Sequence, residues 1–123
     1  MSEPSDPAAG EVSLLVTAGD TALEHHSGDV PVLATPRVLA LAEQAAFLSY
    51  ARRVGEEQTT IGVFAEIHHV KATSVGERVT ARAELVEADE KNLFFKFTVT
   101  QGDEMVAFGT HRRVIVDRTP FLG

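Results

Sequence analysis

The chain has 123 residues, of which 44% are hydrophobic and 24% charged, as expected for a single globular domain with one core. Its formal net charge of -7 disfavours nucleic acids and anionic membranes as partners, because both attract proteins through clustered Lys and Arg. The absence of cysteine excludes disulfides and a thiolate nucleophile, and it agrees with a cytoplasmic location, which we expect.

The N-terminal part is predicted to be a tail that leads into one domain. Residues 1–10 are small, acidic and rich in Pro and Ala, without a secretory signal, so we predict a flexible tail. The domain then covers residues 11–123 and has no apolar run near the roughly 20 residues that a membrane helix needs. Weak alternation over 11–17 predicts a first strand, and the polar segment 18–29 predicts a connection.

The longest predicted element is a helix that begins at Thr35 and runs to about residue 54. Thr35 is a good N-cap, Pro36 suits the first helical position, and Gly55 suits the end of the helix. Alanines keep this helix slim, and it is apolar on nearly every side. A helix of this kind is expected to be buried, so the rest of the chain should wrap around it.

After the helix, the hydrophobic period changes from 3.6 to 2 residues, which predicts β-strands. The clearest alternation runs from Leu93 to Val99, with an apolar residue at every second position. The predicted strands are 61–72, 76–88, 93–101 and 105–116. Short turns between them imply antiparallel neighbours. Together with the first strand, they predict an α+β domain in which about five antiparallel strands cover the helix.

The predicted helix carries one carboxylate, Glu43, among apolar residues. Burial of a lone carboxylate is costly unless the group has a partner or a function. In a functional role, Glu43 would act as a general acid or base, or as a nucleophile if it stays ionised. The competing interpretation is a salt bridge to an arginine from a neighbouring strand or subunit. Composition leaves both interpretations open.

The adjacent His68 and His69 lie in a predicted strand, where neighbouring side chains point to opposite faces. They therefore cannot both bind one metal ion. If Val63, Ala65 and Ile67 face the helix, His69 faces it as well and His68 faces outward. Both a structural and a functional role are open for His69.

Thr35 and His111 are further candidates. Thr35 is either an ordinary N-cap or a hydroxyl that faces a cavity beside the helix N-terminal amides. His111 lies midway along the last predicted strand, two residues after Gly109, which permits a bulge or the close approach of a ligand.

The G-x-S-x-G elbow, the Walker loop and the H-E-x-x-H motif are absent, and we predict neither a metal nor a cofactor.

Several short motifs, taken together, resemble the hot dog thioesterases and specifically the fluoroacetyl-CoA thioesterase-like family. They are Ala34-Thr35-Pro36, Glu43 eight positions after Thr35, Gly62, the run from His69 to Gly76, and Gly109-Thr110-His111-Arg112-Arg113. The resemblance covers roughly residues 30–116. It implies the hot dog fold, in which a long central helix is wrapped by an antiparallel sheet, and a homodimer, with possible higher assembly, that has acyl-CoA pockets at the subunit interface.

The resemblance also implies roles for individual residues. Thr35, Glu43 and His69 would form the catalytic set. Gly62 would let the backbone approach the thioester, and Arg113 and His111 would contact the substrate. The aromatic residue that the fluoroacetyl enzyme carries six residues before its threonine is replaced here by an aspartate, Asp29.

We therefore predict hydrolysis of a short- or medium-chain acyl-CoA, or a related acyl thioester, to free acid and thiol. The carbonyl would be polarised by backbone N–H groups, and Glu43 would either activate water or attack directly. The alternatives are a non-catalytic protein that binds an acyl thioester, and an unrelated small α+β fold that binds a hydrophobic ligand.

Overall fold

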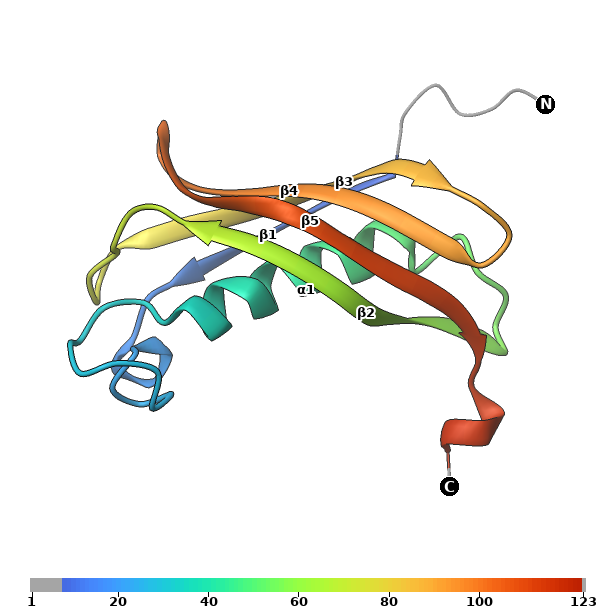
Figure 1. Cartoon of the computed structure of the whole chain (residues 1–123), viewed down its shortest axis with the longest axis horizontal. Coiled ribbons are helices and arrows are strands. Elements are labelled where there is room, and N and C mark those ends of the chain that lie inside the picture. The colour runs from blue at the N-terminus through green and yellow to red at the C-terminus, as the bar shows by residue number, and fades with distance from the viewer. Residues whose placement is uncertain (1–7, 123) are drawn as a thin grey trace.

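The computed structural model describes residues 8–122, in which one long helix packs against one curled sheet (Figure 1). The helix α1 spans Thr35–Tyr50. The strands are β1 (Ala9–Leu15), β2 (Gln58–His69), β3 (Arg78–Ala88), β4 (Asn92–Gln101) and β5 (Glu104–Asp117), with 3₁₀ turns at Ala18–Asp20 and Thr119–Phe121. All pairings are antiparallel, in the order β1-β3-β4-β5-β2. The predicted α+β class with five antiparallel strands is confirmed.

The core lies between α1 and the concave face of the sheet. The helix contributes a stripe of buried residues with helical spacing: Val38, Leu41, Ala42, Ala45 and Ala46. The sheet contributes the apolar positions of its three middle strands, including the alternating residues of β4 that the sequence predicts: Val79, Ala81, Ala83, Leu93, Phe95, Phe97, Val99, Val106 and Ala107. Full burial of each large apolar side chain contributes about 1.5–3 kcal/mol.

Strand β1 begins at Ala9, two residues before the predicted start. Gly10 packs so closely on α1 that a Cβ atom there would collide with the carbonyl oxygen of Ala45. Glycine thus lets the strand backbone approach the helix backbone. Of the tail predicted over residues 1–10, residues 1–7 lie outside the described residues, while Ala9 and Gly10 belong to the sheet.

Both ends of α1 differ from the prediction. Ala34, with extended backbone angles, is the N-cap, and Thr35 is the first helical residue. Thr35 does not cap the helix, because its hydroxyl contacts His69 instead. At the other end, the helix stops at Tyr50 rather than near residue 54. There the Arg53 N–H donates to the Tyr50 carbonyl at 2.9 Å and closes a turn.

Strand β2 contains a β-bulge that decides which of its residues face the helix. Its register with β5 shifts between Gly62 and Phe64, so one extra residue lies in β2 at this point. Gly62 and His69 are an odd number of positions apart, and regular alternation would put them on opposite faces. The extra residue of the bulge brings Gly62 and His69 to the same face of the sheet. Both pair with residues of β5 that are buried.

One face of α1 and most of β2 remain exposed in the single chain. On α1, Phe47 is 37% and Leu48 48% exposed. On β2, the exposed large apolar residues are Ile61, Val63 and Phe64. The expectation that the helix is buried on every side is therefore not met within one chain. No helix in residues 8–122 combines the length and the apolar character that crossing a bilayer requires.

Phe95 tests the assignment of the core. It is 1% exposed and packs in the cluster beneath α1, so Phe95→Ala should lower the free energy of unfolding by about 3–5 kcal/mol. Urea unfolding at one fixed protein concentration measures this change. Phe108→Ala is the control, because Phe108 is 41% exposed and its truncation should cost less than about 1 kcal/mol. Equal losses for the two variants would contradict this core.

Candidate active site

Thr35 and His69 form the first part of the site. The Thr35 hydroxyl and His69 Nδ1 are 2.7 Å apart, which joins the first turn of α1 to the last residue of β2. Burial lowers the pKa of His69 below its usual value, and the Lys71 backbone opposes this in part. His69 Nε2 is buried and has no hydrogen-bond partner among residues 8–122. The imidazole is therefore neutral near pH 7, with one ring nitrogen unused.

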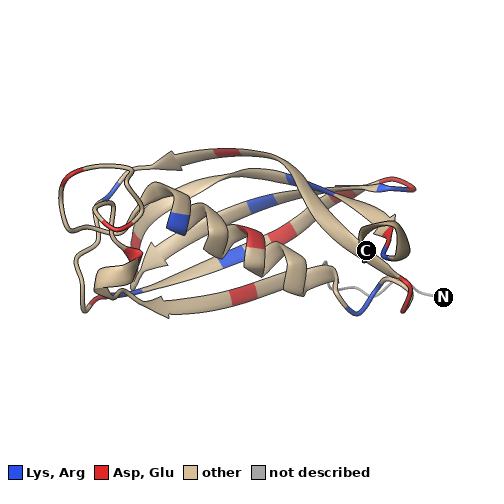
Figure 2. Ribbon diagram, turned by 90° about the horizontal axis from the view of Figure 1, so that it is seen from below, with Lys and Arg blue, Asp and Glu red and all other residues tan. Residues whose placement is uncertain are grey.

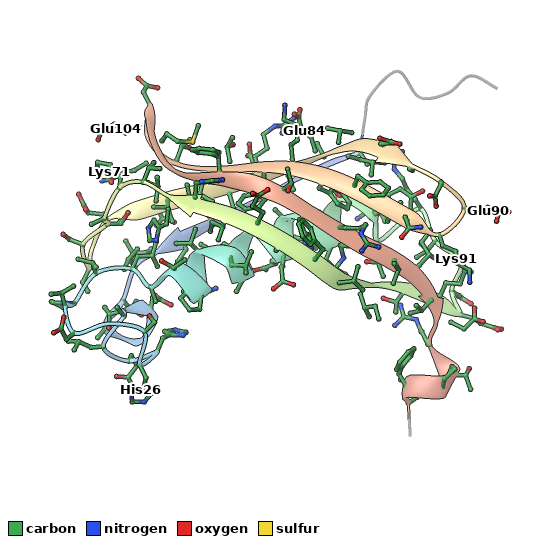
Figure 3. All side chains as sticks on the ribbon, viewed as in Figure 1. His26, Lys71, Glu84, Glu90, Lys91 and Glu104 are labelled. Carbon is green, nitrogen blue, oxygen red and sulfur yellow. The ribbon has the colours of Figure 1, made fainter. Side chains whose placement is uncertain are left out.

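The pair lines a cavity of about 360 Å³ between the segment that precedes α1 and the segment that follows β2. Asp29, which replaces the expected aromatic residue, lines the same cavity. Lys71 also lines it, but its ammonium group already bonds Gln101 and Glu104, each at 3.1 Å. Figure 3 shows Lys71 and Glu104 at the same end of the molecule, beside the turn between β4 and β5. Asp29 thus supplies a carboxylate to the cavity wall.

Glu43 and Gly62 form the second part of the site. Figure 2 shows the few charged positions of α1, which are one basic residue, Arg37, and one acidic residue, Glu43. Glu43 is half-buried and lies over the β2 backbone at Gly62. A Cβ atom at Gly62 would be 2.8 Å from Glu43 Oε2 and 3.0 Å from His111 Cε1. Glycine therefore makes the room that the carboxylate occupies.

Two buried residues of β5, His111 and Arg113, lie beside this carboxylate. Arg113 pairs with Gly62 across the strands, and its Nη1 is 3.3 Å from the position of the missing Cβ. Burial lowers the pKa of His111, as does the charge of Arg113. No ion pair within residues 8–122 includes Glu43, so the competing interpretation of a salt bridge to an arginine of a neighbouring strand is not met within the chain.

The single chain does not bring the three predicted catalytic residues together. Thr35 and Glu43 are eight residues apart on one helix, or about 12 Å along its axis. His69 and Gly62 are seven residues apart on β2, or about 23 Å along the strand. One chain thus carries two separate half-sites: Thr35 with His69, and Glu43 with Gly62, His111 and Arg113.

Two other histidines, His68 and His26, lie outside both half-sites. His68 faces outward, as predicted, and its ring stacks on Phe108 with the centroids 4.9 Å apart. His26 lies in the loop before α1 and points away from the sheet (Figure 3). Residues 8–122 contain no group of three or more His, Cys, Asp or Glu side chains arranged to hold a metal ion.

Thr60 belongs to the second half-site, although the sequence analysis did not identify it. Thr60 is 5% exposed, and it accepts hydrogen bonds from Arg113 through both its hydroxyl and its carbonyl, each at 2.9 Å. The available signal was a threonine two positions before Gly62, near the start of the strand. That signal is indistinguishable from ordinary β-propensity, because threonine is common in strands.

A family model described as fluoroacetyl-CoA-specific thioesterase matches residues 16–119. The structure of the fluoroacetyl-CoA thioesterase FlK has a TM-score of 0.88 at 21% identity, over 98% of this chain and 93% of that chain. A mutant of FlK in complex with fluoroacetate and CoA has a TM-score of 0.87 at 21% identity, over 96% of this chain and 99% of that one.

A hypothetical protein of Thermus thermophilus, described as a thioesterase superfamily member, has a TM-score of 0.87 at 19% identity, over 98% of this chain and 90% of that chain. None of the curated proteins compared matches the chain. The structural similarities confirm the hot dog fold and overturn the alternative of an unrelated α+β fold.

The half-buried His69 and the buried His111 predict a pH dependence of stability. Their pKa values are lowered in the folded chain, so below about pH 6.5 the unfolded chain binds protons more readily than the folded chain. The free energy of unfolding should therefore fall as the pH drops from about 7 towards 5. Urea unfolding across this range measures the slope, and a variant with both His69→Gln and His111→Gln should have a flatter one. An equal slope in that variant would contradict the prediction.

Proposed function

Because the chain belongs to the fluoroacetyl-CoA-specific thioesterase family, we propose that it hydrolyses a short- or medium-chain acyl-CoA to the free acid and CoA. It is thus a thioesterase with the hot dog fold. The observation that carries the proposal is the pair of half-sites, which supply the hydroxyl, imidazole and carboxylate of the predicted catalytic set. CoA as the carrier is supported by the related enzyme that was solved with CoA. We propose a cytoplasmic location.

We further propose that the protein acts as a homodimer joined through β2. This strand is at the edge of the sheet, with β5 on one side only. It has no lysine or proline, the residues that usually block pairing of an exposed edge. Phe47 and Leu48 of α1 lie exposed on the adjacent helix face. Antiparallel pairing of two β2 strands about a two-fold axis would satisfy the edge and cover this apolar surface.

A two-fold axis of this kind would also complete the site. Antiparallel pairing reverses the order of the second strand, so His69 of one subunit would lie opposite the part of β2 that contains Gly62 in the other. The proposed active site then consists of Thr35 and His69 from one subunit with Glu43 and Gly62 of the partner subunit. The unpaired Nε2 of His69 supports this arrangement, because it needs a group from outside the chain or from the substrate.

In the proposed reaction, the thioester carbonyl lies against the backbone at Gly62, where N–H groups stabilise the developing oxyanion. Glu43 takes a proton as water attacks the carbonyl carbon, or attacks that carbon itself to form an anhydride that water then opens. The carbon–sulfur bond breaks, and His69 relays to the thiolate a proton that comes from the attacking water, by way of Glu43 in the first route and directly from the water that opens the anhydride in the second. The Thr35 hydroxyl holds the imidazole in position through its 2.7 Å contact.

A thiol-release assay over a panel of acyl-CoAs tests the proposed activity. The wild-type chain should release CoA from short or medium acyl groups, and Glu43→Gln and His69→Ala should each lower kcat about 100-fold. His68→Ala is the matched control, because His68 faces outward, and it should keep wild-type kcat. Binding of acyl-CoA without release of thiol would instead favour a non-catalytic binding protein. Near-normal activity of both site variants would contradict the assigned residues.

Complementation tests the arrangement of the two half-sites. A heterodimer of one Glu43→Gln subunit and one His69→Ala subunit, isolated with two different tags, has one intact site if the half-sites come from different chains. It should then regain about half of the wild-type kcat per dimer, because a two-fold dimer has two equivalent sites. If each chain supplies a complete site, both sites in the heterodimer are damaged. Absence of complementation would therefore contradict the shared site.

A further inference from the structure

The second half-site contains a buried cation whose bonding partners are all neutral. Arg113 is 7% exposed, and its guanidinium stays charged in proteins. It donates to the Thr60 hydroxyl and the Thr60 carbonyl at 2.9 Å, and to His111 Nε2 at 3.2 Å. No carboxylate among residues 8–122 forms an ion pair with it. A buried charge without a counter-charge in contact is costly, so this arrangement calls for an explanation.

The hydrogen bonds of His111 fix its role. The Phe64 carbonyl can only accept, so Nδ1 of His111 carries the proton that is donated to it at 2.8 Å. Nε2 then holds a lone pair, which accepts from Arg113. Both nitrogens of the neutral ring are thus engaged, and His111 has no proton to give to a substrate. It orients the guanidinium.

Arg113 is fixed on a third side by the helix. The ring of Phe47, one turn after Glu43 on α1, lies 5.7 Å from the guanidinium carbon and covers it. Thr60, His111 and Phe47 together leave the guanidinium little freedom. We call Thr60, His111 and Arg113 the arginine clamp. A rigid clamp suits a group that must hold another charge in place.

The charge that the clamp faces is Glu43. Glu43 Oε2 and Arg113 Nη1 lie 2.8 Å and 3.3 Å from one point, the missing Cβ of Gly62. The opposite charges of Glu43 and Arg113 attract each other. The two groups form no ion pair, because their charged atoms are too far apart. His111 and Arg113 of β5 are the charged or titratable groups that face Glu43, while Arg37 of α1 is paired with Asp20 at 2.9 Å.

We propose that Arg113 is a positioning residue that keeps the Glu43 carboxylate directed at the backbone of Gly62, and that Thr60 and His111 hold Arg113 for this purpose. A direct salt bridge would occupy the carboxylate oxygens, whereas a cation held slightly away stabilises the charge and leaves both oxygens free to react. The inference rests on the proposed function.

Kinetics of clamp variants test the proposal. Arg113→Gln should lower kcat about 100-fold, because the reacting carboxylate loses its orienting charge, and should change KM for acyl-CoA less than about threefold. Arg112→Gln is the matched control, since Arg112 bonds Asn92 instead, and it should leave kcat unchanged.

The hydroxyl of Thr60 provides a milder test that does not depend on the folding of an Arg113 variant. Thr60→Val preserves shape and removes one acceptor of the guanidinium, and it should lower kcat about tenfold. Thr60→Ser keeps the hydroxyl and should restore most of this loss. In a Glu43→Gln background, Arg113→Gln should cause little further loss, because Arg113 acts through Glu43.

The outcomes separate this inference from the proposed function. An active wild-type enzyme in which Arg113→Gln raises KM and leaves kcat unchanged overturns the positioning role. A full additional loss in the Glu43→Gln background also overturns the positioning role. A wild-type chain that releases no thiol from any acyl-CoA overturns both proposals.

Discussion

The close approach of α1 to the sheet is the constraint on which the rest of the structure depends. Glycine and alanine make this approach possible, with Gly10 under the carbonyl of Ala45 and Gly62 under the carboxylate of Glu43. Larger side chains at these positions would push the helix away from β1 and β2. The same closeness lets the Thr35 hydroxyl reach the ring of His69. Packing and site geometry therefore share one cause.

Much of the fold could be predicted from the sequence because its signals are local. The alternation from Leu93 to Val99 matches the buried face of β4, and the predicted turns separate the strands where expected. The helix ends were less accurate, and at the start of the helix the reason is a contact with a distant residue. Thr35 has the chemistry of an N-cap, yet its hydroxyl is engaged by a histidine 34 residues later in the chain. A local pattern cannot include such a contact.

The site could be predicted only in part for similar reasons. Glu43 was conspicuous because a carboxylate in an apolar helix breaks the pattern, and His69 faced the helix as alternation required. The bulge at Gly62 gave no signal in an apolar run, and Thr60 was hidden by ordinary strand composition. The expected full burial of the helix failed within one chain, since Phe47 and Leu48 remain exposed. The apolar composition of a helix predicts that its surface is buried. It does not predict whether the same chain or another chain buries it.

The β-bulge in β2 has a consequence for how this enzyme can vary. Gly62 meets one part of α1 and His69 another, and only the extra residue between them keeps both on the same side. A substitution at the extra residue keeps Gly62 and His69 on the same face of the sheet. A deletion or a further insertion of one residue would turn either Gly62 or His69 to the opposite face. Lineages that retain this chemistry can therefore exchange side chains along the strand, but they cannot change its residue count by one.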